Sequence, residues 1–471
     1  MAELRLLCWV GEFASHGEMT TGEVTQGVDV EGVDVEAERA AWLAGKPARS
    51  PEVEQARFAG DVPDAHDLDL ADINPYNPHL FREDRWHDHF ARLRHEDPVH
   101  FNELASAGRY WSITTWDAIR EAEADWRTFS SEPSIVLGPP IGAPLPSAID
   151  QVGSFIAMDP PEHEQQRITV RRSTTPAANK VYEPLIRQRV GDVLDALPVG
   201  ETFNWVERVS VELTAMMLAT LFGIPLDDRH KLMRWSDVAT TIPEPGGLIE
   251  STAQRRAEFA EMLEYFDALW AQRRAEPGDD LVSMLAHGEA TRDMTPLQQV
   301  GNLMLLIIGG NDTTRNTMSG SVYAFNEFPE QFAALRADPS LVDNLAHEII
   351  RWQTPLNYMR RTATADCEFR GRKIKQHDQV LLWYLSANRD DAVFDDADSF
   401  DLRRPNANRH LSFGHGIHYC MGARLAEMQV RVLWEEIVRR DMRVELRAEP
   451  TRTFSSFIHG YLDVPVRIVR A

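Results

Sequence analysis

The stretch HLSFGHGIHYCMG, residues 410–422, holds a single cysteine, Cys420, in a loop rich in glycine and histidine. A lone cysteine is most often a small buried apolar residue. In this loop, however, Gly414, Gly416 and Gly422 allow the backbone to pass very close to a flat or bulky group, and they leave amide groups pointing at whatever the sulfur holds. The sequence of the loop therefore predicts that the thiol is a ligand or a nucleophile.

Three kinds of chemistry use a thiol held in this way. A nucleophilic cysteine needs a base, and His418 lies two residues from Cys420. A zinc site could recruit His415 as well, but zinc needs a fourth ligand at a recognisable spacing, and the other two cysteines, Cys8 and Cys367, are far apart in the chain. The third chemistry, axial ligation of haem iron, needs one thiolate only.

Length and composition indicate one large globular unit. The chain has 471 residues, of which 43% are hydrophobic and 26% charged, and no linker rich in proline, glycine and serine divides its middle. Residues 1–62 differ from the rest, because they are acidic and poor in aromatic residues. This composition predicts that residues 1–62 form a flexible extension ahead of a globular domain over residues 63–471.

The charge and the apolar segments limit the partners. A net charge of −24 argues against nucleic acid and anionic membranes, because both are negatively charged. The most concentrated apolar run, LMLLII at 303–308, is too short to cross a bilayer, which takes about 20 residues. The amino terminus is a poor signal peptide, and three distant cysteines do not indicate a disulfide framework. We therefore expect a cytoplasmic protein without a membrane anchor, acting on small molecules.

Hydrophobic periodicity predicts a mainly α-helical protein with small β-sheets. Apolar residues recur at helical spacing in 209–222 and 258–274, and the apolar stretch 303–317 is long enough for a buried helix. Short strands are expected within 367–374 and 379–386.

The cysteine loop resembles the motif Phe-Gly-x-Gly-x-His-x-Cys-x-Gly of the cytochrome P450 haem-thiolate monooxygenases. All the fixed positions are matched, by Phe413, Gly414, Gly416, His418, Cys420 and Gly422. The resemblance implies the cytochrome P450 fold, a haem b cofactor with Cys420 as the iron ligand, and contact of His418 with a haem propionate. Phe413 and the glycines would shelter the sulfur. A thiolate ligand pushes electron density toward iron, which favours cleavage of the O–O bond.

A second motif lies in the apolar stretch LMLLIIGGNDTTRNT, residues 303–317. Two consecutive glycines in a helix cost roughly 1 kcal/mol each relative to alanine, so a function is expected to compensate. On a structural interpretation, Thr313 bonds back to the carbonyl of Gly309 and Asp312 pairs with Arg315. On the interpretation that the resemblance favours, the glycines make room for oxygen, Thr313 hydrogen-bonds the bound dioxygen, and Asp312 helps to deliver protons.

The segment EIIR, residues 348–351, places Glu348 and Arg351 one helical turn apart. Most such pairs are solvated surface ion pairs worth about 0 to 1 kcal/mol. In the family that the chain resembles, this pair is internal and is completed by an arginine ahead of the cysteine loop. Arg404 matches that position, with Arg403 as the adjacent alternative, and we expect the three residues to be structural.

Two further segments resemble the haem propionate contacts of the family. MDPPEHEQQR supplies His163 and Arg167, although Asp-Pro-Pro-Glu is also a common start of a solvated helix. MRRTA supplies Arg361, with Arg360 beside it as the alternative. Because two propionates need only a few cations, not all of these side chains are expected to bind them.

The chain is most similar to bacterial terminal alkane and fatty-acid hydroxylases of this family, from about residue 70 to the carboxyl end. The resemblance implies hydroxylation of medium-chain alkanes or fatty acids at the terminal carbon, with O2 and with electrons from a ferredoxin and its NADH-dependent reductase. Because a methyl C–H bond is stronger than the methylene bonds beside it, selectivity must come from positioning. The expected walls of the substrate site are Ile135, Val136, Leu137, Leu305, Ile308, Gly309, Leu356, Phe457 and Ile458.

Two other functions stay open. The same chemistry could act on terpenes or other bulky apolar molecules, and a non-catalytic haem sensor is the more remote alternative. Asn357 and Tyr358 are bulkier and more polar than expected in an alkane-oxidising member, which leaves the chain length of the substrate open. Docking of an acidic ferredoxin would need a local basic patch, for which the candidates are Arg171, Arg172 and Arg424.

Overall fold

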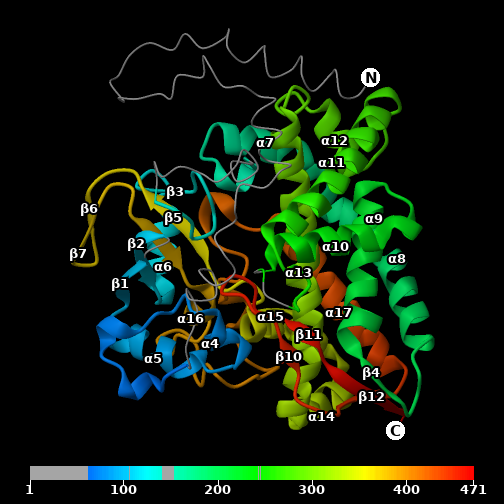
Figure 1. Ribbon diagram of the computed structural model, residues 1–471. Coiled ribbons are helices and arrows are strands. Elements are labelled where there is room, and N and C mark those ends of the chain that lie inside the picture. The colour runs from blue at the N-terminus through cyan, green and yellow to red at the C-terminus, as the bar shows by residue number, and fades with distance from the viewer. Residues whose placement is uncertain (1–61, 105–106, 141–152, 242, 244–245, 471) are drawn as a thin grey trace.

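The computed structural model describes residues 62–104, 107–140, 153–241, 243 and 246–470. Helices make up most of this part, with small sheets beside them, which confirms the predicted fold class (Figure 1). Of the predicted extension, residues 1–61 lie outside the described residues, and its last residue, Val62, is buried. No helix in the described part is long and apolar enough to span a membrane.

The helices fall into two groups (Figure 1). Four short helices lie on the side of the main sheet: α4 (Pro78–Arg82), α5 (Trp86–Glu96), α6 (Trp116–Ala124) and α16 (Tyr384–Ala387). The others form a helical body: α7 (Glu162–Arg171), α8 (Pro176–Asp195), α9 (Glu212–Phe222), α10 (Arg229–Thr240), α11 (Thr252–Ala275), α12 (Leu281–His287), α13 (Pro296–Glu327), α14 (Pro329–Ala337), α15 (Val342–Gln353) and α17 (Ala423–Arg439).

The main sheet has strands in the order β1-β2-β8-β5-β3, where β2 and β8 are parallel and the other pairs are antiparallel. Its strands are β1 (Val99–Leu104), β2 (Gly108–Ile113), β3 (Phe129–Ser130), β5 (Met359–Ala363) and β8 (Gln379–Leu382). Three smaller sheets, β4-β12-β9, β10-β11 and β6-β7, contain β4 (Thr202–Asn204), β6 (Cys367–Phe369), β7 (Arg372–Ile374), β9 (Met442–Leu446), β10 (Thr451–Arg452), β11 (Tyr461–Asp463) and β12 (Pro465–Arg470).

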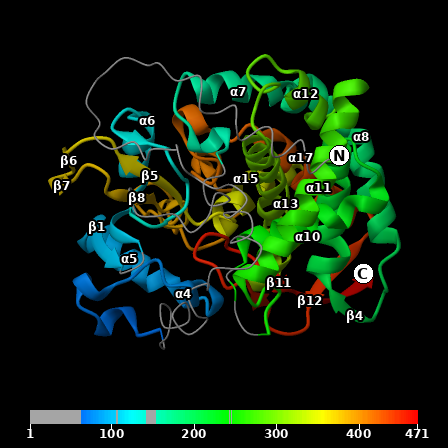
Figure 2. The same ribbon diagram turned by 45° about the horizontal axis from the view of Figure 1, so that its top comes forward.

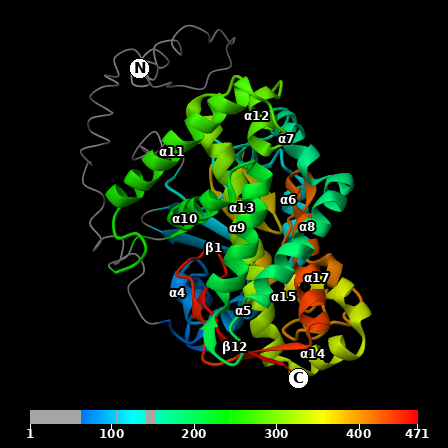
Figure 3. The same cartoon turned by 90° about the vertical axis from the view of Figure 1, so that its right-hand side faces the viewer.

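Helix α13 runs through the middle of the helical body (Figure 2, Figure 3). It begins with a capping box, in which the side chains of Thr295 and Gln298 each accept a hydrogen bond from the other residue's amide, and Pro296 occupies its first turn. The helix packs against α9, α10, α15 and α17. Polar residues in its middle are therefore held inside the molecule.

Two predicted elements differ from the structure at their ends. The helix predicted over 209–222 begins earlier, as a π-helix over Val206–Val211 that continues into α9. The strand predicted within 379–386 ends at Leu382, and the chain then forms α16. The apolar residues of both β8 and α16 are buried, so hydrophobicity alone could not mark this boundary.

A buried ion cluster joins α15 to the segment ahead of the cysteine loop. Glu348 and Arg351 are fully buried, and Arg351 donates from Nε to Glu348 Oε2 at 2.7 Å. Arg404 donates from Nε to Glu348 Oε1 at 3.0 Å, and the amide of Asp401 donates to the same oxygen at 2.9 Å. The neighbouring Arg403 is exposed. The cluster thus fixes the approach to the cysteine loop against the helical body.

Candidate active site

The cysteine loop packs against helix α6. The Cys420 amide donates to the carbonyl of Phe413 at 2.8 Å, which closes the loop. Gly414 and Gly416 both have a φ of 69°, a left-handed conformation that favours glycine. A Cβ atom at position 416 would lie 2.7 Å from the carbonyl oxygen of Glu123, so a side chain there would separate the loop from α6.

The Cys420 thiol lies at the start of helix α17. Burial raises its pKa, whereas the amides of Gly422 and Ala423 and the charge of Arg167 stabilise the thiolate. His418 does not act as its base, because neither ring nitrogen bonds the sulfur. Within the described residues no group of three or more His, Cys, Asp and Glu side chains could hold a metal ion, which leaves the zinc alternative without a ligand set there.

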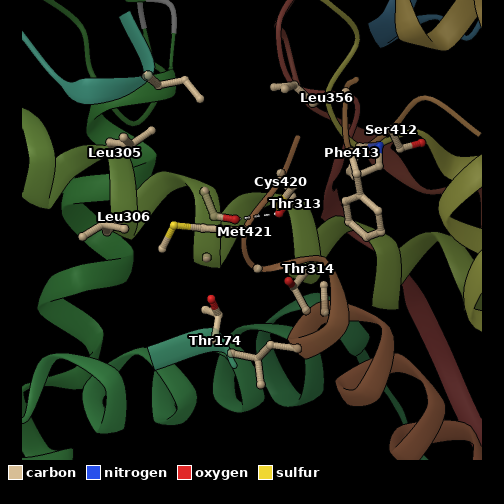
Figure 4. Close-up of a pocket in the computed structure, with 18 of the residues that line it drawn as sticks. Thr174, Leu305, Leu306, Thr313, Thr314, Leu356, Ser412, Phe413, Cys420 and Met421 are labelled. Carbon is tan, nitrogen blue, oxygen red and sulfur yellow. Dashed lines mark hydrogen bonds between the residues drawn. The ribbon is translucent and has the colours of Figure 1, made fainter. Parts of the chain in front are cut away.

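Helix α13 forms another wall of the space beside the sulfur. Cys420 and Thr313 line one cavity, which we call the thiol cavity (Figure 4). Thr313 Oγ1 donates to the carbonyl of Gly309 at 2.8 Å. A Cβ atom at Gly309 would meet nothing within 4 Å, whereas one at Gly310 would lie 2.8 Å from Cδ2 of Leu218. Gly309 thus faces open space, whereas Gly310 allows the close approach of α13 to α9; room for oxygen beside these glycines stays a prediction.

Asp312 faces helix α10 rather than the thiol cavity. Its Oδ1 accepts from Arg315 Nη2 at 2.6 Å, and its Oδ2 accepts from the Ser236 hydroxyl at 3.0 Å. Arg315 also donates to Asp237 at 2.7 Å, and the Asp237 side chain is 33% exposed. Burial raises the pKa of Asp312 to about 6, although the charge of Arg315 lowers it. Asp312 is thus linked to the surface, while Thr313 faces the cavity.

Two buried histidines lie in tilted contact beside the cysteine loop. The rings of His163 and His418 have their centroids 4.1 Å apart, and His418 Nε2 shares a hydrogen bond of 2.8 Å with the Ser131 hydroxyl. Burial, aided by nearby arginines, lowers their pKa values to about 4 and about 2, so both rings are neutral. Nε2 of His163 and Nδ1 of His418 are buried without a hydrogen-bond partner in the described part of the chain.

The predicted arginines occupy different positions around this site. Arg167 lines the thiol cavity and donates to the carbonyl of Tyr419. Arg361 also lines the cavity, whereas Arg360 is directed elsewhere and donates to Thr362 Oγ1 at 3.0 Å. Six other predicted site residues line the thiol cavity, namely Leu305, Gly309, Leu356, Phe413, His418 and Gly422.

The sequence analysis missed a buried acid that contacts Arg361. Glu123, on α6, accepts at Oε1 from Arg361 Nη2 at 3.2 Å and from the Tyr384 hydroxyl at 2.6 Å. Tyr384 lines the thiol cavity together with Arg361. Glu123 thus lies behind two of the side chains that a bound group would meet.

A second cavity, of about 550 Å³, adjoins the thiol cavity, and we call it the apolar cavity. The two cavities share Ile156, Leu305, Gly309, Thr313, Leu356 and Met359. All the residues predicted as walls of the substrate site line the apolar cavity, namely Ile135, Val136, Leu137, Leu305, Ile308, Gly309, Leu356, Phe457 and Ile458. The structure therefore gathers segments that are more than 300 residues apart in the sequence around one space.

Asn357 and Tyr358, which are bulkier and more polar than expected in an alkane-oxidising member, have different surroundings. Asn357 is fully buried, and its Nδ2 donates to the carbonyl of Ser456 at 3.0 Å. Tyr358 lines the apolar cavity, its hydroxyl accepts from the Leu137 amide at 3.3 Å, and its ring packs edge to face against Phe457. Tyr358 therefore shapes the cavity, whereas Asn357 braces the loop behind it.

The chain matches one protein family over most of its length. The family model described as Cytochrome P450 matches residues 142–452. Linalool 8-monooxygenase of Pseudomonas putida is 35% identical over 401 residues, which is 83% of this chain and 98% of that protein. Methyl-branched lipid omega-hydroxylase of Mycobacterium tuberculosis (strain ATCC 25618 / H37Rv) is 33% identical over 389 residues, which is 80% of this chain and 90% of that protein.

A solved structure gives the same result for the fold. Cytochrome P450-153 from Novosphingobium aromaticivorans superposes with a TM-score of 0.79 and 45% identity, and the match covers 84% of this chain and 99% of that one. Sequence and structure comparisons thus indicate the same family. The chain belongs to the cytochrome P450 family of haem-thiolate monooxygenases.

Proposed function

We propose that this enzyme hydroxylates medium-chain alkanes or fatty acids at the terminal carbon, using O2 and electrons from a ferredoxin. The observation that carries the proposal is the apolar cavity, which follows α13 from Val300 to Thr313, about 20 Å of helix, and adjoins the thiol cavity. A long, unbranched apolar chain fits a space of this kind with one end beside Thr313.

The thiol cavity fits the haem of the family, which is iron protoporphyrin IX. The two buried ring nitrogens of His163 and His418 that have no partner in the described residues would meet the cofactor carboxylates, and Arg361 adds a cation on the cavity wall. Open space beside Gly309 leaves α13 clear of side chains there. We therefore assign the iron to Cys420. A haem bound through a thiolate supplies the cleavage of O2.

Selectivity for the terminal carbon would come from positioning. Methylene groups are intrinsically easier to oxidise than the methyl group beside them, so only the chain end can be allowed to reach the reacting position. Leu305 and Leu356 lie on either side of the pocket and belong to both cavities (Figure 4). These two side chains narrow the passage, which favours a chain end over a bulky group.

Proton supply would use the polar residues of α13. Asp237 is partly exposed and bonds Arg315, which in turn bonds the buried Asp312. With a pKa of about 6, Asp312 can gain and lose a proton near neutral pH. Asp312 bonds Ser236 and Arg315 rather than Thr313, so its carboxyl would have to turn toward the thiol cavity to deliver that proton to the Thr313 hydroxyl.

Titration of the haem-loaded ferric protein tests the substrate class. We expect octane and a medium-chain fatty acid to shift the spin-state absorbance and to bind at least tenfold more tightly than a monoterpene, about 1.4 kcal/mol. Product analysis should then find the terminal alcohol as the main product. Tighter binding of the monoterpene, or oxidation mainly at internal carbons, would contradict the proposal.

One comparison favours a second candidate function. Linalool is a branched terpene alcohol, and the monooxygenase that acts on it is 35% identical to this chain. The lipid omega-hydroxylase, at 33% identity, instead supports a chain-end substrate. The same titration and product analysis distinguish the two, because the terpene candidate predicts the opposite order of binding.

Thr313→Ala is expected to uncouple electron use from product formation. Without the hydroxyl, protons would reach oxygen without control, so at least half of the reducing equivalents should appear as hydrogen peroxide while substrate binding changes less than threefold. The matched control is Thr220→Ala, because Thr220 Oγ1 bonds back to Met216 at 3.0 Å in the same manner but lies on α9. A haem sensor would bind its ligand unchanged and consume no electrons in either variant.

The electron donor is proposed to be a ferredoxin with an NADH-dependent reductase, because bacterial members of the family use redox partners of this kind. The chain has no nucleotide-binding fingerprint and no cysteine cluster of its own. Arg171, Arg172 and Arg424 are exposed, as a docking patch for an acidic protein requires.

A further inference from the structure

Glu123 is a buried acid beside the haem site that has no part in the mechanism above. Its residue is 3% exposed, and it lies on α6 under the cysteine loop. Oε1 accepts from the Tyr384 hydroxyl at 2.6 Å and from Arg361 Nη2 at 3.2 Å. Oε2 is buried without a hydrogen-bond partner in the part of the chain that the structure describes. One oxygen is thus fully used, and the other is placed to hold a proton.

The surroundings of Glu123 balance its two charge states. Burial raises its pKa to about 7, although the charge of Arg361 and hydrogen bonds from Tyr384 and the His415 amide favour the carboxylate. Burial therefore outweighs the opposing charge and hydrogen bonds, which brings the pKa of Glu123 close to neutral pH. A small change in the charge of the adjoining site is therefore enough to change the protonation state of Glu123.

Other titratable groups lie around Glu123 on three elements. On α16, burial raises the pKa of Tyr384 well above its usual value. On the cysteine loop, burial lowers the pKa of His415, beside the cation Arg120, and that of His418 to about 2. On β5, Arg361 donates from Nη2 to Glu123 Oε1 at 3.2 Å. Burial raises the pKa of Glu123 to about 7, so we expect this carboxyl to exchange a proton near neutral pH.

Arg361 connects Glu123 to the cofactor position. It lines the thiol cavity and contacts Glu123 with the same guanidinium group. When Glu123 is ionised, a cofactor carboxylate must share Arg361 with it. When Glu123 is protonated, the charge of Arg361 acts on the cofactor carboxylate alone.

We propose that Glu123 is a positioning residue that sets the charge at the propionate end of the haem site, and that its carboxylate takes up one proton when the site gains one electron. The electron comes from the ferredoxin or a chemical reductant, and the proton comes from solvent and binds Oε2, so the net charge of the site is unchanged. The inference rests on the haem site proposed above, since it needs a propionate near Arg361.

Redox titration of the haem-loaded full-length protein between about pH 5 and pH 9 tests the inference. An ionised Glu123 stabilises the oxidised, more positive site, so the potential of the wild type should fall as the pH rises through about 7. The reduction equilibrium should change by up to tenfold per pH unit, about 59 mV for one electron. The potential of Glu123→Gln should not fall with pH in this range, and it should stay near the value that the wild type has at acidic pH.

Two further variants make the result specific. Glu121→Gln is the matched control, because Glu121 lies on the same helix and is exposed, paired with Arg370 at 2.7 Å; it should behave as the wild type. Tyr384→Phe keeps the acid but removes a donor to the carboxylate, so the pH at which its potential falls should be higher. The inference would be overturned if the potential of Glu123→Gln fell with pH as it does in the wild type. It would also be overturned if the pH at which the potential falls were the same in Tyr384→Phe as in the wild type. A wild type that binds no haem would instead refute the proposed site.

Discussion

Cys420→Ser is expected to abolish both the activity and the thiolate signature of the haem. A serine hydroxyl cannot replace the thiolate that pushes electron density toward iron, so the red-shifted absorbance of the reduced carbonyl complex should be lost. Substrate hydroxylation should fall by at least about 1,000-fold, to the background of the assay. Carbonyl difference spectra and product analysis measure the two effects independently.

Cys367→Ser is the matched control for this experiment. Cys367 is also a free, partly buried cysteine, but it lies in β6, away from both cavities. This variant should keep the spectrum and the activity of the wild type. If Cys420→Ser retained the red-shifted spectrum, or if both variants lost it, the assignment of the iron ligand would be wrong.

Glu348→Gln is expected to lower the free energy of unfolding by about 3 to 5 kcal/mol. The carboxylate of Glu348 accepts from both Arg351 and Arg404, and all three side chains are at least 95% buried. The amide would leave two buried guanidinium groups without an anion to balance them. Denaturant unfolding measures the loss, and the haem should also dissociate faster, because the cluster fixes the cysteine loop.

The control for Glu348 is an ion pair on the surface. Lys375 bonds Asp366 at 2.7 Å, and both side chains are about 60% exposed. Asp366→Asn should therefore cost at most about 1 kcal/mol. If the two variants lost the same free energy of unfolding, burial of the Glu348 cluster would not add to stability.

The parts of the site that the sequence predicts are those carried by contiguous motifs. Residues 413–422 and the Glu348 to Arg351 spacing are short patterns whose chemistry requires particular side chains at fixed separations. The substrate walls could also be assigned, because they flank these motifs. The structure then decided between neighbours, placing Arg361 rather than Arg360 at the cavity and Arg404 rather than Arg403 at Glu348.

The parts that could not be predicted depend on contacts between distant segments. Glu123 meets Arg361 and Tyr384, which lie more than 230 residues further along the chain. Its spacing from Trp116 and Ile119 places Glu123 on the buried face of α6, which could have indicated a buried acid. The neighbouring sequence, however, does not reveal which residues contact it. Likewise, no local pattern reveals that Gly310 is required by Leu218.

The separate directions of Asp312 and Thr313 have a consequence for the catalytic cycle. Helix α10 contributes to both routes, since Ser236 and Asp237 hold the polar link to Asp312 while Thr240 lines the apolar cavity. Thr240 also contacts the Asp312 carboxylate, so a substrate in the apolar cavity would lie next to the polar link. Under the proposed function, proton supply from the surface through Asp237 and Asp312 would then depend on how the substrate occupies the space beside Thr240.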